Sequence, residues 1–266
     1  MNTYPAYAAI PAANWSLLKE LSRSPRHYQY RLTHPREDTP AMRLGRAVHC
    51  AVLEPRQFAR SFVSYDGTRR GKAWEEFADA HADVDILSVT EMEQCHAIRD
   101  AVRSNRDARR LLRKGESEKT ITWTDRATRI PCKARVDRVG HGFFVELKTT
   151  RSLDPRDFQR TCAALSYHGQ LAFYARGLKA NRRKTHPVVI AVENEPPYDV
   201  VVYQPDEDFL WLGDELAGEL LAKLAACRKA NRWPGRSRGV QALSLPGWML
   251  SQYDEATSDL VFTKET

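Results

Sequence analysis

The segment from Val136 to Lys148 constrains the fold of this 266-residue chain more than any other. Apolar and polar residues alternate on both sides of His141-Gly142, which predicts a β-hairpin with a two-residue turn. In that register Asp137 lies directly opposite Glu146, with their Cβ atoms roughly 5 Å apart. Residues at i and i+2 share a strand face, so Glu146 and Lys148 point the same way.

This pairing of charges has a chemical consequence. Two carboxylates so close repel each other unless a cation lies between them, and a hard divalent ion with oxygen ligands satisfies both. Lys148 beside such an ion could orient or help deprotonate an attacking water and stabilise charge on a phosphate. The pattern is typical of a metal-dependent nuclease. The alternative is a charged strand face on which Glu146 and Lys148 form a solvated pair.

The region after the hairpin predicts a helix that adds polar groups. Tyr167, Gln170 and Tyr174 stand at i, i+3 and i+7, so they share one helical face. Gln170 could hydrogen-bond a metal-bound water or a phosphate, and the tyrosines could contact DNA. The alternative is an amphipathic helix whose two aromatic residues belong to the core.

Elsewhere the sequence predicts helices first, then strands, and then further helices and strands. The first part predicts a helix over 14–21 and another from Thr39-Pro40 to Leu53, and Thr90 to Glu93 predicts a capping box for a third. Strands are expected over 119–124, 130–136, 143–147, 188–192 and 200–203, with helices over 154–164, 166–179 and 205–230.

These elements predict an α/β fold with a mixed central β-sheet flanked by helices. We expect a single domain over 1–266, with a helical N-terminal part to about residue 115, a sheet core over about 116–231 and a C-terminal tail over 232–266. The tail lacks periodicity, and we expect it to wrap the domain or to serve an oligomer contact.

Composition narrows the class of protein. The net charge of +7 suits a polyanionic partner. No apolar run is long enough to cross a bilayer and the N-terminus does not resemble a signal peptide, so we expect a cytoplasmic protein without membrane contact. The five cysteines are scattered without a CxxC pair, which argues against a zinc knuckle or a local iron–sulfur site.

Asp137, Glu146-x-Lys148 and Gln170-xxx-Tyr174 occur in an order that resembles the PD-(D/E)XK nuclease superfamily. Within it the chain resembles the phage-type RecE exonucleases (exonuclease VIII), on the strength of Leu44-Gly45-Arg46-Ala47-Val48-His49-Cys50 and Ser24-Pro25-x-His27-Tyr28. Tyr167-xx-Gln170 is also similar to a motif of the lambda-type exonucleases. The resemblance covers roughly residues 14–230 and implies a restriction-endonuclease-like core.

The resemblance also implies roles for individual residues. His49, Asp137, Glu146 and the Leu147 backbone carbonyl would bind Mg²⁺, for which Mn²⁺ could substitute. Lys148 would be the catalytic lysine, supported by Gln170 and Tyr174. Glu146 stands where the RecE type commonly has Asp, so the ligand is one methylene longer. A histidine in this setting is by itself more often structural than a ligand, and the position of His49 in the matching motif is what favours the ligand role.

Basic and aromatic residues are the candidates for DNA contact. Their common property is a positive or π-bearing side chain near the proposed site or in a basic loop. They are Arg43, Arg46, Arg69, Arg70, Lys72, Trp74, Arg156, Arg160 and Tyr167. For Arg69 to Lys72, a plain surface loop is the alternative.

From the resemblance we expect a Mg²⁺-dependent exonuclease of phage or prophage type, acting in the bacterial host cytoplasm. It would digest one strand of linear double-stranded DNA from the 5′ end and leave a 3′ single strand for annealing. A ring-shaped homo-oligomer, trimeric or tetrameric, and a single-strand annealing protein would be its partners. The rivals are an endonuclease on the same fold and a DNA-binding or assembly module without turnover.

Overall fold

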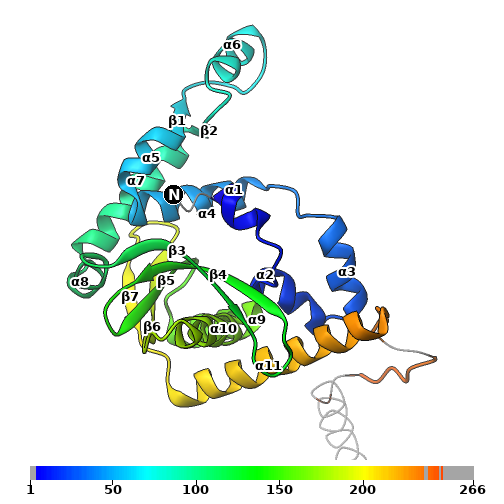
Figure 1. Cartoon of the computed structure of the whole chain (residues 1–266). Helices are drawn as coiled ribbons and strands as arrows, with labels where there is room; N and C mark the ends of the chain where they lie inside the picture. Colours follow the sequence, from blue (N-terminus) through cyan, green and yellow to red (C-terminus); the bar gives the residue numbers. More distant parts are fainter. Residues whose placement is uncertain (1–3, 237–238, 246, 248–266) are drawn as a thin grey trace, which may run out of the picture.

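A computed structural model describes residues 4–236, 239–245 and 247 of the chain (Figure 1). The N-terminal half is largely helical: α1 (Tyr4–Ala9), α2 (Trp15–Leu18), the 3₁₀ turn η1 (Lys19–Ser22), α3 (Pro25–Thr33), α4 (Pro40–Leu53), α5 (Pro55–Ser61), α6 (Lys72–Ala80), α7 (Val89–Ser104) and α8 (Arg106–Leu112). The later helices are α9 (Pro155–Leu165), α10 (Tyr167–Ala180) and α11 (Glu207–Ala230).

The central sheet has five strands in the order β3-β4-β5-β6-β7. Its strands are β3 (Glu116–Thr124), β4 (Pro131–Val139), β5 (Phe143–Thr150), β6 (His186–Glu193) and β7 (Val200–Tyr203). Only β5 and β6 run parallel, and the other neighbours are antiparallel. The mixed sheet with flanking helices confirms the predicted fold class, and all five predicted strands are present with longer bounds for four of them.

Both faces of this sheet are buried, each under its own helices. On one face, Phe144 packs with Phe173 of α10 and Leu220 of α11. On the other face, Val145 and Leu147 pack with Val48 of α4 and with α7. Alternation along β5 therefore sends successive side chains into two separate cores, as period-two geometry requires. α10 and α11 lie along the first face in Figure 1.

Side-chain caps fix where the helices begin. Asp154 and Asp206 cap α9 and α11, each accepting hydrogen bonds from backbone amides of the first turn. The predicted capping box at Thr90 is wrong. The box uses Ser88 and Glu91 instead, so α7 begins at Val89. Ser88 ends the short strand β2 (Asp85–Ser88), where its extended backbone suits an N-cap.

Residues 62–88 form an extension that the sequence did not predict, called here the arm. The short strand β1 (Phe62–Tyr65) pairs in parallel with β2, and α6 lies beyond them. The arm projects away from the central sheet in Figure 1. Its own small cluster holds it together, with Tyr65 against Trp74 and Phe77 at ring-centroid distances of 5.1 and 4.8 Å.

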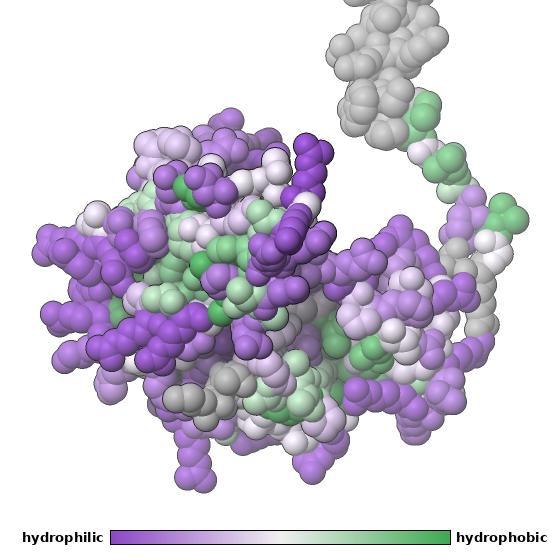
Figure 2. Space-filling view, turned by 90° about the horizontal axis from the view of Figure 1, so that it is seen from above, coloured by the Kyte–Doolittle hydropathy of each residue, from purple (hydrophilic) through white to green (hydrophobic). Residues whose placement is uncertain are grey.

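The chain beyond α11 is only partly described, so the predicted role of the tail in wrapping or oligomer contact falls mostly outside the described residues. Within them, Trp233 stacks on Tyr28 of α3 at 5.7 Å between ring centroids. The division of 1–266 into one domain with three parts stays a prediction. None of the helices in the described part of the chain is both long and apolar enough to cross a membrane. Viewed from the arm side, the surface is mostly hydrophilic, with apolar residues in small groups (Figure 2).

Candidate active site

Asp137 occupies the point where β4 and β5 part. The turn closes with Gly140 N donating to Phe143 O at 3.0 Å, and the ladder pairs Val139 with Phe144 and Arg138 with Val145. This is the register that the two-residue turn predicts. The ladder then stops, and Asp137 Oδ2 instead accepts a hydrogen bond from Leu147 N at 2.7 Å. A side-chain carboxylate thus replaces a backbone carbonyl, which fixes Asp137 beside β5.

Glu146 and Lys148 form a tight group with α10. Lys148 Nζ donates to Glu146 Oε2 and to Gln170 Oε1, both at 3.0 Å. Gln170 Nε2 donates to Glu146 Oε2 at 3.1 Å and to Tyr174 Oη at 3.1 Å. The predicted face of α10 therefore meets the predicted face of β5. Tyr174 is buried as the core alternative requires, yet its hydroxyl also orients Gln170.

Glu146 and Lys148 do not form the solvent-exposed ion pair of the alternative interpretation. Only 2% of Glu146 is exposed, and 7% of Asp137. Glu146 Oε1 is buried without a hydrogen-bond partner among the described residues. A buried carboxylate oxygen without a partner is costly unless a cation or water satisfies it. This orphaned atom fits a metal ligand.

His49 reaches the same place from the opposite face of the sheet. α4 packs on the Leu147 side, and His49 Nδ1 lies 3.5 Å from Asp137 Oδ2. His49, Asp137 and Glu118 each offer one ligand atom, and these atoms lie within 4.8 Å of one another. The donor set of one imidazole and two carboxylates fits a divalent cation. Among the described residues this group does not include Glu146, which was also predicted as a ligand.

Glu118 is the residue that the sequence reasoning missed. It lies on β3, outside the predicted strand, and has a positive φ of 50°. The β3–β4 ladder pairs Ser117 with Arg138 and Lys119 with Val136, but skips the position between them. A left-handed residue inside a strand costs on the order of 1 kcal/mol or more. The signal available in the sequence was a carboxylate on the strand next to Asp137.

Burial and neighbouring charges together set the pKa values of the acidic groups and the histidine in the site. Burial, with the nearby Asp137 charge, raises the pKa of Glu118 to about 7, and the same two causes raise that of Glu146 to about 7. Burial alone would raise the pKa of Asp137, but His49 and Lys148 lower it below its usual value. Burial opposes the charge on His49, yet Asp137 raises the pKa of its imidazole.

Neighbouring carboxylates keep Lys148 charged at neutral pH. Burial would lower its pKa, but Glu146 and Asp137 outweigh that effect and raise it. Its ammonium also lies 4.7 Å from the ring centroid of Tyr167, a cation–π contact. Tyr167, predicted as a DNA contact, is thus already engaged at the edge of this site.

The other predicted DNA contacts are scattered. Arg46 forms a bidentate pair with Asp38 at 2.6 and 2.8 Å, which occupies its guanidinium. Arg43, on the same helix, is half-buried. On α9, Arg156 and Arg160 are exposed, and Arg160 lies 3.3 Å from Asp157.

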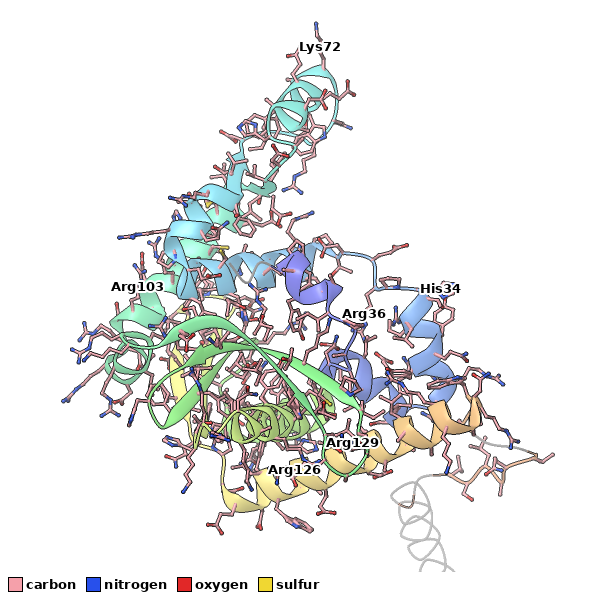
Figure 3. All side chains as sticks on the ribbon, viewed as in Figure 1. His34, Arg36, Lys72, Arg103, Arg126 and Arg129 are labelled. Carbon is pink, nitrogen blue, oxygen red and sulfur yellow. The ribbon has the colours of Figure 1, made fainter. Side chains whose placement is uncertain are left out.

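The four remaining candidates, Arg69, Arg70, Lys72 and Trp74, lie in the arm, with Lys72 at its tip (Figure 3). Arg69 donates to Ile86 O at 3.0 Å and covers Trp74 at 5.7 Å, so it holds the arm together. The structure therefore does not bring these four residues to the site.

A mixed sheet with two carboxylates and a lysine on its central strands defines a PD-(D/E)XK-like fold and site. The chain belongs to the family described as a PDDEXK-like domain of unknown function (DUF3799), which matches residues 14–246.

A solved structure from Eubacterium rectale, titled a "putative exonuclease", is similar with a TM-score of 0.64 and 14% identity, covering 92% of this chain and 94% of that one. A second, titled SSO0001, has a TM-score of 0.30 and 14% identity over 78% of this chain and 85% of that one, too low to compare folds. Among curated proteins no match was found. The family and the site together support a nuclease.

Proposed function

We propose that the protein is a Mg²⁺-dependent DNA exonuclease that degrades one strand of linear double-stranded DNA. The observation that carries this proposal is the group of Glu146, Lys148 and Gln170 beside Asp137, with one Glu146 oxygen buried and unpartnered. Charged groups held rigidly in a buried site, with perturbed pKa values and one carboxylate oxygen left unpartnered, are typical of catalytic centres.

His49, Asp137, Glu118 and Glu146 would hold the cation, and the Leu147 carbonyl is a further candidate ligand. A divalent ion bound there would polarise the phosphate and lower the pKa of water. Mg²⁺ matches the carboxylate-rich donor set, and Mn²⁺ could replace it because carboxylate and carbonyl ligands suit that ion as well.

Lys148 would stabilise charge that builds on the phosphate. Its ammonium is positive at neutral pH and is fixed by Glu146 and Gln170, so little reorganisation is needed when charge develops. Gln170 holds both partners through one amide, and Tyr174 fixes that amide. Tyr167 limits the movement of the ammonium from its other side.

The finer parts of the proposal rest on the resemblance to RecE-type exonucleases. They are 5′→3′ polarity, a product with 3′ single-stranded overhangs for annealing recombination, a ring-shaped trimer or tetramer, a single-strand annealing partner and a place in the host cytoplasm. The likeness to the Eubacterium rectale structure supports the fold on which they depend.

The test uses linear duplex labelled at the 5′ or 3′ end and a closed circle of the same sequence, with Mg²⁺ or with EDTA. We expect mononucleotide release from linear DNA alone, and only with Mg²⁺. Cutting circles at the same rate would replace the exonuclease with an endonuclease. DNA binding without cleavage of any substrate would indicate the binding module instead.

A matched pair of variants assigns the activity to this site. Lys148→Ala should abolish release, whereas Lys184→Ala, at an exposed position in the α10–β6 connection, should leave it unchanged. Equal activity in both variants would exclude the proposed site.

A further inference from the structure

Helix α8 carries a regular row of arginines on its exposed side. Arg106, Arg109 and Arg110 of the helix and Arg113, its C-cap residue with helical backbone angles, stand at i, i+3, i+4 and i+7. All four are exposed, and they are called here the arginine stripe. The other side of the helix packs into the core through Ala108. Neighbours at i+3 and i+4 have Cβ atoms about 5–6 Å apart, so the stripe presents its charges in one line.

These charges are barely compensated. Residues 99–114 contain seven basic and two acidic side chains, a net of +5 in a chain of net +7. Within the described structure, the one acidic side chain that pairs with the stripe is Asp107, which lies 3.7 Å from Arg110. In Figure 3, Arg103 is labelled beside the nitrogen-tipped side chains that α8 extends into solvent. Such an uncompensated row favours a polyanion.

The arginine stripe lies a short distance along the chain from the candidate active site. Arg113 precedes Glu118 by five residues, which limits the distance between their Cα atoms to about 18 Å. Gly115 joins α8 to β3 with φ of +127°, and a Cβ there would lie 2.4 Å from Val139 O. This glycine lets the chain pass against the β4–β5 hairpin, and Ala108 packs α8 into the core.

We propose that the arginine stripe binds the phosphate backbone of the DNA duplex whose end lies in the candidate active site. The inference rests on the proposed function and adds a location for the duplex. A guanidinium fork matches phosphate oxygens, and four of them in line would displace about as many counterions. The reach of about 18 Å corresponds to about five base pairs from the reacting phosphate at 3.4 Å for each pair.

A second copy of the chain is the rival occupant. The arm has six acidic and three basic side chains, so its net charge is opposite to that of the stripe. The three basic residues of the arm, Arg69, Arg70 and Lys72, lie near its acidic ones in the chain and leave it a net charge of only −3. DNA offers an uninterrupted row of negative charges and is therefore the better match.

The test compares two quadruple variants, both in a Lys148→Ala background with EDTA so that the duplex stays intact. One replaces the stripe by glutamine (R106Q, R109Q, R110Q, R113Q). The control removes four exposed charges elsewhere, as R126Q, R129Q, K229Q and R232Q. Glutamine has a helix propensity close to that of arginine, and thermal unfolding checks that both variants fold.

We expect the slope of log K against log salt to become less negative by about 3.6 in the stripe variant, since each of the four lost phosphate contacts contributes roughly 0.9. The control should change the slope by less than about 1. Equal slopes in the two variants would overturn the proposal. An unchanged slope with a shifted oligomeric state in sedimentation would assign the stripe to a second copy. Because no cleavage is measured, failure of the nuclease proposal gives a separate result.

Discussion

The two halves of the candidate site differ in how far they are already satisfied. The lysine half, made by Glu146, Lys148 and Gln170, is held by four hydrogen bonds of 3.0–3.1 Å that include Tyr174, and Glu146 Oε1 remains without a partner among the described residues. The histidine half, made by His49, Asp137 and Glu118, has a 3.5 Å approach between His49 and Asp137. Arg135 pairs with Glu118 at 2.9 Å, yet burial and the Asp137 charge still raise the pKa of Glu118.

The difference indicates that the two halves have separate functions. The hydrogen-bonded network around Lys148 holds its shape without a ligand, so the lysine half is ready to act on a phosphate. The histidine half is electrostatically incomplete, and a cation would relieve the repulsion between Asp137 and Glu118. Variants of each half therefore test whether catalysis and metal binding separate along this line.

The largest effect is expected for Lys148→Met, which keeps the apolar stem and removes the charge. Activity should fall about 10³-fold, as for loss of a charge-stabilising donor. Metal affinity should stay within about tenfold, because Lys148 belongs to the other half. Single-turnover cleavage measures the activity, and Mn²⁺ calorimetry measures the metal affinity. A parallel loss of both would remove the distinction between the halves.

Glu118→Gln should show the opposite pattern. We expect Mn²⁺ affinity to fall roughly 10- to 100-fold, with cleavage restored at high metal concentration. Glu116→Gln is the matched control, since Glu116 is on the same strand but exposed and paired with Arg183 at 2.9 Å. If the two variants bind Mn²⁺ alike, Glu118 has no part in the metal site.

The metal-free protein should lose stability as pH rises. Glu118 and Glu146 have pKa values near 7 in the folded chain, above the usual 4.5. A carboxyl whose pKa rises on folding contributes stability that is complete below 4.5 and lost as pH passes 7. We expect the melting temperature in EDTA to fall on the order of 5 °C between pH 5 and pH 8.

Addition of Mg²⁺ should reverse that fall at pH 8 and have little effect at pH 5, where the carboxyls are protonated. In Glu118→Gln the decline should be shallower. Melting temperatures that rise with pH in EDTA would contradict the assignment of these two groups.

The smallest effect is expected for Tyr174→Phe. This change removes one 3.1 Å hydrogen bond to Gln170 and keeps the buried ring. Stability should fall by about 1 kcal/mol and activity by less than about tenfold, with metal affinity unchanged. Gln170→Ala should cost more, because it releases Lys148 and Glu146 together. A Tyr174→Phe variant more impaired than Gln170→Ala would mean that the hydroxyl acts directly.

Sequence reasoning located the lysine half well because local rules govern it. Alternation on β5 places Glu146 and Lys148 on one face, and helical spacing aligns Gln170 with Tyr174. The same rules failed for the arm, where short strands carry little periodicity. They also failed at the start of α7, where Ser88 and Thr90 were both plausible caps.

The sequence by itself therefore determined the mixed α/β fold, the register of the β4–β5 turn and the shared faces of β5 and α10. Only the tertiary structure decided that Glu118 joins His49 and Asp137, and that the arm carries its basic residues away from them. The physical reason is the separation along the chain over which each rule acts. Strand and helix periods act over a few residues, whereas the histidine half depends on a left-handed residue in β3, a ladder that stops early and a helix packed across the opposite face of the sheet.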